Sequence, residues 1–77
     1  MLELYTIESC PYCAQMRADL EWKREAFIEY DVEKDPGALK RVVKLCEGDC
    51  NVPVLVRNGE VVQVGYEGRS CYARVDR

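Results

Sequence analysis

The chain has 77 residues, enough for one hydrophobic core, so we expect a single domain over residues 1–77. Hydrophobic residues make up 48% of the chain and charged residues 32%, which is typical of a globular protein and excludes a disordered one. The formal net charge is -3, and the charges are spread along the chain. A nucleic-acid-binding protein, which usually has a clustered basic face, is therefore not expected.

The sequence has no charged-then-apolar leader and no apolar run of about 18 residues, so we expect neither a signal peptide nor a membrane span. We expect a cytoplasmic protein, and a monomer. Five cysteines are an odd number for a secreted disulfide framework, and in a reducing compartment cysteines more often serve catalysis or metal binding. The absence of histidine excludes Cys/His catalysis and zinc sites with histidine ligands.

The first part of the chain predicts a strand, a helix and a second strand. Residues 2–7 alternate imperfectly, with Leu4 on one side and Tyr5 on the other, as in a strand covered on at least one face. Pro11 suits the first position of a helix, which the amphipathic pattern extends to about residue 25. Residues 27–32 are rich in aromatic and β-branched types and predict a strand. A strand, helix and strand of this length predict a parallel pair joined by a right-handed crossover.

The second part predicts a helix and a hairpin. Asp35 caps a helix that begins at Pro36, has one apolar face and ends at Gly48. Residues 52–56 and 60–64 form two strands of a hairpin, because Asn-Gly between apolar runs is a strong turn signal. The glycine-flanked residues 65–68 predict a loop, and Ser70 to about Val75 a short final helix.

Cys10 and Cys13 form a Cys-x-x-Cys motif at the junction of the first strand and helix, which is typical of thiol–disulfide chemistry. Only the thiolate attacks a disulfide, and a helix N-terminus lowers the pKa of a cysteine placed there. Cys10 is therefore the predicted nucleophile, and Cys13, one turn later, the thiol that resolves the mixed disulfide. The alternative is a metal or iron–sulfur module that uses Cys10 with external thiols or with Cys46, Cys50 and Cys71.

Several motifs together resemble the glutaredoxin family of the thioredoxin fold, from Leu2 to about Gly68. They are Tyr5-Thr6, then Cys10-Pro11-Tyr12-Cys13, and Asn51-Val52-Pro53 before a hairpin with Asn58-Gly59. The resemblance implies an α/β, thioredoxin-like βαβαββ(α) fold with a mixed four-stranded sheet in the order 2-1-3-4.

The same resemblance implies a thiol–disulfide oxidoreductase with a redox-active disulfide, acting in electron transfer and cell redox homeostasis. It implies disulfide-containing protein substrates, no bound cofactor or metal, and glutathione as co-substrate. Pro53 would be a cis-proline that holds the Val52 backbone ready to pair with a bound peptide or glutathione. The implied substrate-binding residues are Tyr12, Asn51, Val52, Pro53 and Glu67.

The sequence departs from the family pattern where glutathione would bind. Ile7, with the acidic Glu8 beside it, stands where a lysine usually precedes the motif. Residues 65–69 stand where the family has a Gly-Gly turn and an acidic pair that binds the glutathione amine. The Gly65-Tyr66 segment is similar to that of the glutaredoxin-like hydrogen donors of ribonucleotide reductase, which take electrons from thioredoxin reductase. The reductant is therefore either glutathione or a thioredoxin-reductase-type flavoenzyme, and we expect the glutathione system to work poorly.

The remaining cysteines and two arginines have open roles. Cys46 lies on the apolar stripe of the second helix, which favours a core position. Cys50 and Cys71 are either bystanders or auxiliary thiols near the active-site rim. Arg17 and Arg69 either support the thiolate or a substrate carboxylate, or are solvated surface side chains.

Overall fold

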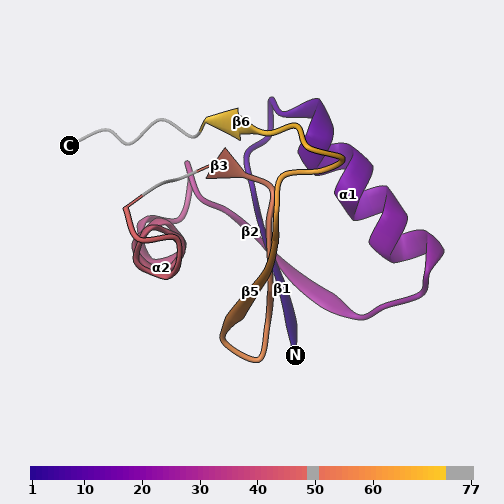
Figure 1. Ribbon diagram of the computed structural model, residues 1–77, viewed down its shortest axis with the longest axis horizontal. Coiled ribbons are helices and arrows are strands. Elements are labelled where there is room, and N and C mark those ends of the chain that lie inside the picture. Colours follow the sequence, from indigo (N-terminus) through magenta and orange to yellow (C-terminus); the bar gives the residue numbers. More distant parts are fainter. Residues whose placement is uncertain (49–50, 73–77) are drawn as a thin grey trace.

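The computed structural model describes residues 1–48 and 51–72 (Figure 1). Six strands and two helices are found within these residues, and no described helix is long and apolar enough to cross a membrane. In chain order the elements are β1 (Leu2–Thr6), α1 (Pro11–Trp22), β2 (Phe27–Asp31), α2 (Pro36–Leu45), β3 (Asn51–Val52), β4 (Val54–Arg57), β5 (Glu60–Val64) and β6 (Cys71–Tyr72).

The main sheet has four strands in the order β2-β1-β4-β5. Strands β1 and β2 are parallel, whereas β4 is antiparallel to β1 and to β5. Counting β4 and β5 as the third and fourth predicted strands, this is the predicted 2-1-3-4 order, so the mixed α/β fold is confirmed. The predicted hairpin turn is also present. Asn58 and Gly59 both adopt the positive φ that such a two-residue turn needs, at 51° and 83°.

Both helices end slightly before the predicted residue, and each does so with a non-glycine residue in the left-handed conformation. After α1, Arg24 has φ 58° and the N–H of Glu25 donates to the Leu20 carbonyl at 3.0 Å. After α2, Glu47 has φ 58° and the N–H of Gly48 donates to the Val43 carbonyl at 2.8 Å. These bonds satisfy carbonyls that the helix itself leaves unpaired.

Two sequence-based predictions in the last third of the chain are wrong. Residues 52–56 do not form one strand, because Pro53 has no N–H to donate to a ladder and separates β3 from β4. The expected helix from Ser70 is absent in its described part, where Cys71 and Tyr72 form strand β6 instead. The remainder of that prediction, residues 73–75, lies outside the described residues.

The helices cover opposite faces of the sheet, with α1 on one side and α2 on the other (Figure 1). On the α1 side, Leu4 and Leu55 pack with Met16 of the helix. On the α2 side, Tyr5 and Val54 belong to a second cluster with Val42. Alternate residues of β1 thus enter different cores, as a strand with two covered faces requires. The second cluster also contains Cys10, Cys13 and Val52, so the core reaches the candidate site.

Candidate active site

Cys10 lies at the N-cap of α1, directly before Pro11 at the first helical position. Its backbone is extended, with φ -91° and ψ 116°, and its N–H donates to the Ile7 carbonyl at 3.4 Å. The first N–H groups of a helix have no intrahelical acceptor, and the helix dipole makes this end positive. A thiolate on Cys10 is therefore favoured by its position, as the sequence indicated.

Cys13 lies one turn into α1 as a fully buried free thiol. Burial raises its pKa, and the nearby charges of Glu29 and Asp31 raise it further. A hydrogen bond with the Ile7 backbone and the charge of Arg17 act in the opposite direction, but burial is the largest effect. At neutral pH Cys13 is thus a protonated thiol, whose attack on a disulfide requires loss of the proton.

Cys71 is bonded to Cys10 by a disulfide, with the two Cα atoms 5.9 Å apart and the two residues 61 positions apart in the sequence. Strand β6 carries Cys71 to this point and lies beside β3, near the start of α1 (Figure 1). With this partner in place, only 2% of Cys10 is exposed. Of the two auxiliary thiols considered from sequence, Cys71 is therefore placed at the site, and Cys50 lies outside the described residues.

The Val52–Pro53 peptide bond is cis, as the resemblance implied. Val52 and Pro53 are fully buried, and β3 pairs antiparallel with β6 so that Val52 faces Cys71 and Asn51 faces Tyr72. The backbone edge expected to receive a substrate strand is thus occupied by the chain itself. The Pro53 carbonyl accepts the N–H of Gly65 at 2.7 Å, which joins this edge to the segment before β6.

The other predicted binding residues are divided between the site and a turn. Tyr12 is half-buried and packs against the cluster that holds Cys10 and Cys13. Glu67 is exposed, with φ 52°, in a tight turn closed by hydrogen bonds between the backbones of Tyr66 and Arg69. Glu67 and Arg69 are therefore both exposed residues of this turn, which precedes β6.

Arg17 makes a two-pronged ion pair with Glu29 across α1 and β2. Its Nε and Nη2 donate to the two carboxylate oxygens at 2.6 and 2.5 Å. The hydroxyl of buried Thr6 donates to the same carboxylate at 2.9 Å. These contacts, the Arg17 hydrogen bond first, lower the pKa of Glu29 although its partial burial opposes this. Arg17 is thus held in place and adds a positive charge near Cys13.

We expect Glu29→Gln to reduce stability at neutral pH and to leave acid stability unchanged. Because folding lowers the pKa of Glu29, its contribution is present above the unfolded value near 4.5 and is lost as the pH falls through the folded value. The effect should be at most about 1 kcal/mol, since both side chains are partly exposed and solvent screens the pair. The free energy of unfolding, measured by urea titration from neutral pH to pH 3, gives this difference.

Glu8→Gln is the matched control for that measurement. Lys34 also lowers the pKa of Glu8, but both groups are exposed, so water screens their pair. The stability of Glu8→Gln should follow that of the unmodified chain across the pH range. If Glu29→Gln shows the same pH dependence as Glu8→Gln, the ion pair of Arg17 does not stabilise the fold.

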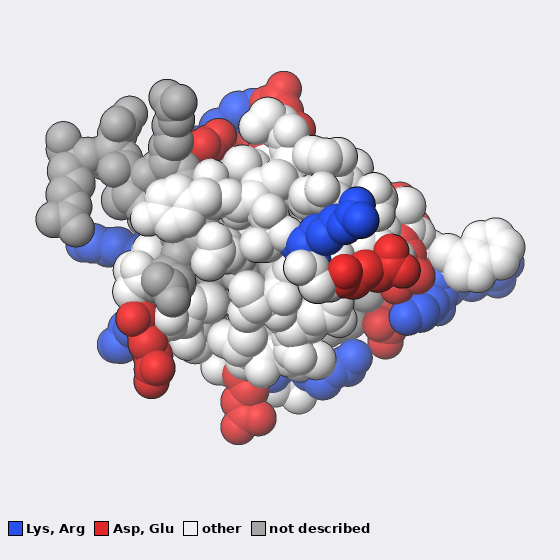
Figure 2. All heavy atoms as spheres, turned by 45° about the horizontal axis from the view of Figure 1, so that its top comes forward, with Lys and Arg blue, Asp and Glu red and all other residues white. Residues whose placement is uncertain are grey.

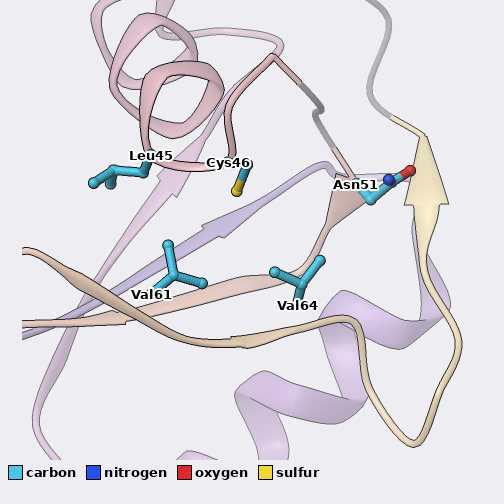
Figure 3. A pocket seen from close by; sticks show the side chains of 5 residues that line it. All are labelled: Leu45, Cys46, Asn51, Val61 and Val64. Atoms are coloured by element: carbon cyan, nitrogen blue, oxygen red, sulfur yellow. The ribbon is translucent and has the colours of Figure 1, made fainter.

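A pocket of about 180 Å³ lies between the end of α2 and β5 (Figure 3). It is lined by Leu45, Cys46, Asn51, Val61 and Val64, and the sulfur of Cys46 points into it (Figure 3). Cys46 is half-buried and packs against the core, which fits the predicted core position. Within residues 1–48 and 51–72, no group of three or more cysteine and carboxylate side chains is arranged to hold a metal ion.

The surface around β6 and the start of α1 is mainly uncharged (Figure 2). In this view the acidic and basic side chains lie mostly around the edge of the face, and a few lie to one side of its centre. A partner that approaches this face therefore meets mainly uncharged atoms.

Sequence reasoning located Cys10, Cys13, Val52 and Pro53 but did not identify Cys71 as the partner of Cys10. The missed signal was the turn. Gly65 and Gly68 both have positive φ and reverse the chain direction, so that the following strand β6 pairs with β3. Reading Ser70 as the start of a helix hid this return, because a helix would not extend the β3 edge.

Comparison with known proteins agrees with this fold. The glutaredoxin family model matches residues 2–62. The chain is 34% identical over 59 residues to the probable glutaredoxin slr1562 of Synechocystis sp. (strain ATCC 27184 / PCC 6803 / Kazusa). That match covers 77% of this chain and 54% of the relative, so the chain spans about half the length of this curated protein.

Two solved structures are also similar. The crystal structure of the thioredoxin-like protein BC3987 has a TM-score of 0.72 and 34% identity, covering 80% of this chain and 84% of that one. The crystal structure of a mutant of the same protein has a TM-score of 0.75 and 32% identity, covering 86% and 82%. The fold is thus thioredoxin-like, and with a family model that spans most of its length, the chain belongs to the glutaredoxin family.

Proposed function

We propose that the protein is a thiol–disulfide oxidoreductase that reduces disulfides of protein substrates, with Cys10 as the nucleophile. The observation that carries this proposal is Cys10 at the positive N-terminus of α1, within disulfide-bonding reach of another thiol of the chain. Membership of the glutaredoxin family supports the same chemistry.

In the proposed reaction the Cys10 thiolate attacks one sulfur of the substrate disulfide, and the other substrate sulfur leaves as a thiolate. The Cys13 thiolate then attacks Cys10, which releases the substrate reduced and leaves a Cys10–Cys13 disulfide. Its position one turn from Cys10 in the same cluster supports this role. An external reductant supplies two electrons and two protons to restore the dithiol.

For that reductant we favour a thioredoxin-reductase-type flavoenzyme over glutathione. The acidic Glu8 is ion-paired to Lys34 beside the motif, and Glu67 is an exposed side chain in the turn between Tyr66 and Arg69. The lysine that Ile7 replaces would make a charged hydrogen bond to glutathione, and such a bond contributes about 1.5–3 kcal/mol. Its loss should lower glutathione-linked turnover about tenfold or more.

The test compares NADPH consumption with thioredoxin reductase against consumption with glutathione and glutathione reductase, using the same protein disulfide as substrate. We expect at least about tenfold faster turnover in the first system. An equal or faster glutathione-linked rate would show that the reductant is wrong and leave the reaction intact. No turnover in either system would refute the oxidoreductase function itself.

A further inference from the structure

Strand β6 presents Cys71 to Cys10 in the way that a bound substrate strand would present its cysteine. An extended peptide binds a sheet edge through backbone hydrogen bonds, while its side chains enter neighbouring sites. Here Cys71 pairs with Val52 on the β3 edge, and its sulfur is bonded to Cys10. Cys71 thus makes both the backbone pairing and the disulfide, as the cysteine of a bound substrate peptide would in a mixed disulfide.

The connection to β6 is short and built to hold this position. Residues 65–70 join β5 to β6, and they are fixed by the Gly65–Pro53 hydrogen bond and by the Tyr66–Arg69 pairing. A thiol held by such a tether reacts at an effective concentration on the order of millimolar or above. Cys71 therefore competes with external thiols for Cys10.

We propose that β6 is an internal substrate mimic and that Cys71 is a third redox-active thiol. Like Cys13, Cys71 can form a disulfide with Cys10. This rests on the proposed function, because it assigns a second resolving thiol to the same nucleophile. The Cys71 thiolate attacks Cys10 in a mixed disulfide, a Cys10–Cys71 bond forms, and the substrate sulfur leaves as a thiolate. Cys13 can then attack Cys10 and release Cys71 as a thiolate, with no net change in oxidation.

Two features make the Cys10–Cys71 form a closed state. Cys10 is only 2% exposed, and the Val52 edge is already paired, so neither is open to a further substrate. Cys13, which must open this state, is buried, and burial raises its pKa. Few Cys13 side chains are thiolates at neutral pH. The attack of Cys13 on Cys10, which releases Cys71, is therefore slow and becomes faster as the pH rises.

The first experiment maps disulfides after oxidation with diamide, which accepts the two electrons and two protons that the thiols lose. Cys13→Ser is compared with Cys13→Ser/Cys71→Ser and with the matched control Cys13→Ser/Cys46→Ser, with remaining thiols blocked before digestion. We expect a peptide linked through Cys10 and Cys71 in the first and third chains and its complete loss in the second. Absence of that peptide from Cys13→Ser overturns the proposal.

The second experiment treats the same chains with glutathione disulfide. Cys13→Ser should release glutathione and form the Cys10–Cys71 bond, whereas Cys13→Ser/Cys71→Ser should keep glutathione on Cys10. Retention of glutathione in both chains overturns the proposal but leaves Cys10 as a reactive nucleophile. The unmodified chain, mapped early in diamide oxidation, should also contain the linked peptide, which guards against misfolding of the serine variants.

These outcomes are separate from a failure of the proposed function. Turnover assays of the unmodified chain test the function, and the diamide mapping tests the Cys10–Cys71 pair without any substrate. A chain that forms the pair but shows no turnover keeps this inference and loses the function. A chain that turns over without forming the pair keeps the proposed function and loses this inference.

Discussion

Cys10→Ser should abolish disulfide reduction, with turnover lowered at least about a thousandfold. The serine hydroxyl does not ionise near neutral pH, so the positive end of α1 has no thiolate to stabilise. The remaining cysteine of the motif, Cys13, cannot replace the nucleophile, because it is fully buried and its pKa is raised. NADPH consumption coupled to reduction of a protein disulfide measures this loss.

Cys46→Ser is the control for Cys10→Ser. Its sulfur points into the pocket between α2 and β5 and is not part of the proposed chemistry. The control should keep turnover within about twofold of the unmodified chain, which is far from the loss expected at the nucleophile. If Cys10→Ser turned over at a rate similar to that of Cys46→Ser, Cys10 could not be the nucleophile.

Gly65→Ala should lower the free energy of unfolding more than any other glycine substitution in the two turns that flank β5. Gly65 has φ 83°, and a Cβ built there lies 2.8 Å from the carbonyl oxygen of Arg69. The left-handed conformation costs alanine about 1–2 kcal/mol. The contact with backbone adds about 1–3 kcal/mol, because the turn must shift to make room.

Gly59→Ala separates these two costs. Gly59 also has φ 83°, but an added Cβ would meet nothing within 4 Å. Its loss of stability should therefore be only the conformational cost, smaller than that of Gly65→Ala by the cost of the contact. Urea unfolding of both variants, under the same oxidising conditions, measures the difference. Equal losses would show that the turn before β6 tolerates the added methyl group.

Gly65→Ala should also change the position of Cys71 relative to Cys10. Gly65 donates to the Pro53 carbonyl and starts the segment that returns to β3. A shifted turn should move β6 away from Val52 and reduce the yield of the Cys10–Cys71 disulfide, whereas Gly59→Ala should not.

Much of the fold could be predicted from sequence because its signals are local. Pro11 and Pro36 begin the two helices, and the Asn58-Gly59 turn joins two adjacent strands. The alternation in residues 2–6 correctly divides Leu4 and Tyr5 between the two faces of the sheet. Helix ends were less predictable, because Arg24 and Glu47 adopt a conformation that sequence patterns normally assign to glycine.

The reactive end of α1 was determined by the sequence itself. Cys10 precedes Pro11, and the physics of a helix N-terminus follows from that order alone. The identity of the third thiol was decided only by the tertiary structure. Cys71 is 61 residues from Cys10, and its approach depends on the Gly65 turn and on β6 pairing with β3 instead of forming a helix. Pairing between strands is set by distant partners, so two residues such as Cys71 and Tyr72 carry no local signal for it.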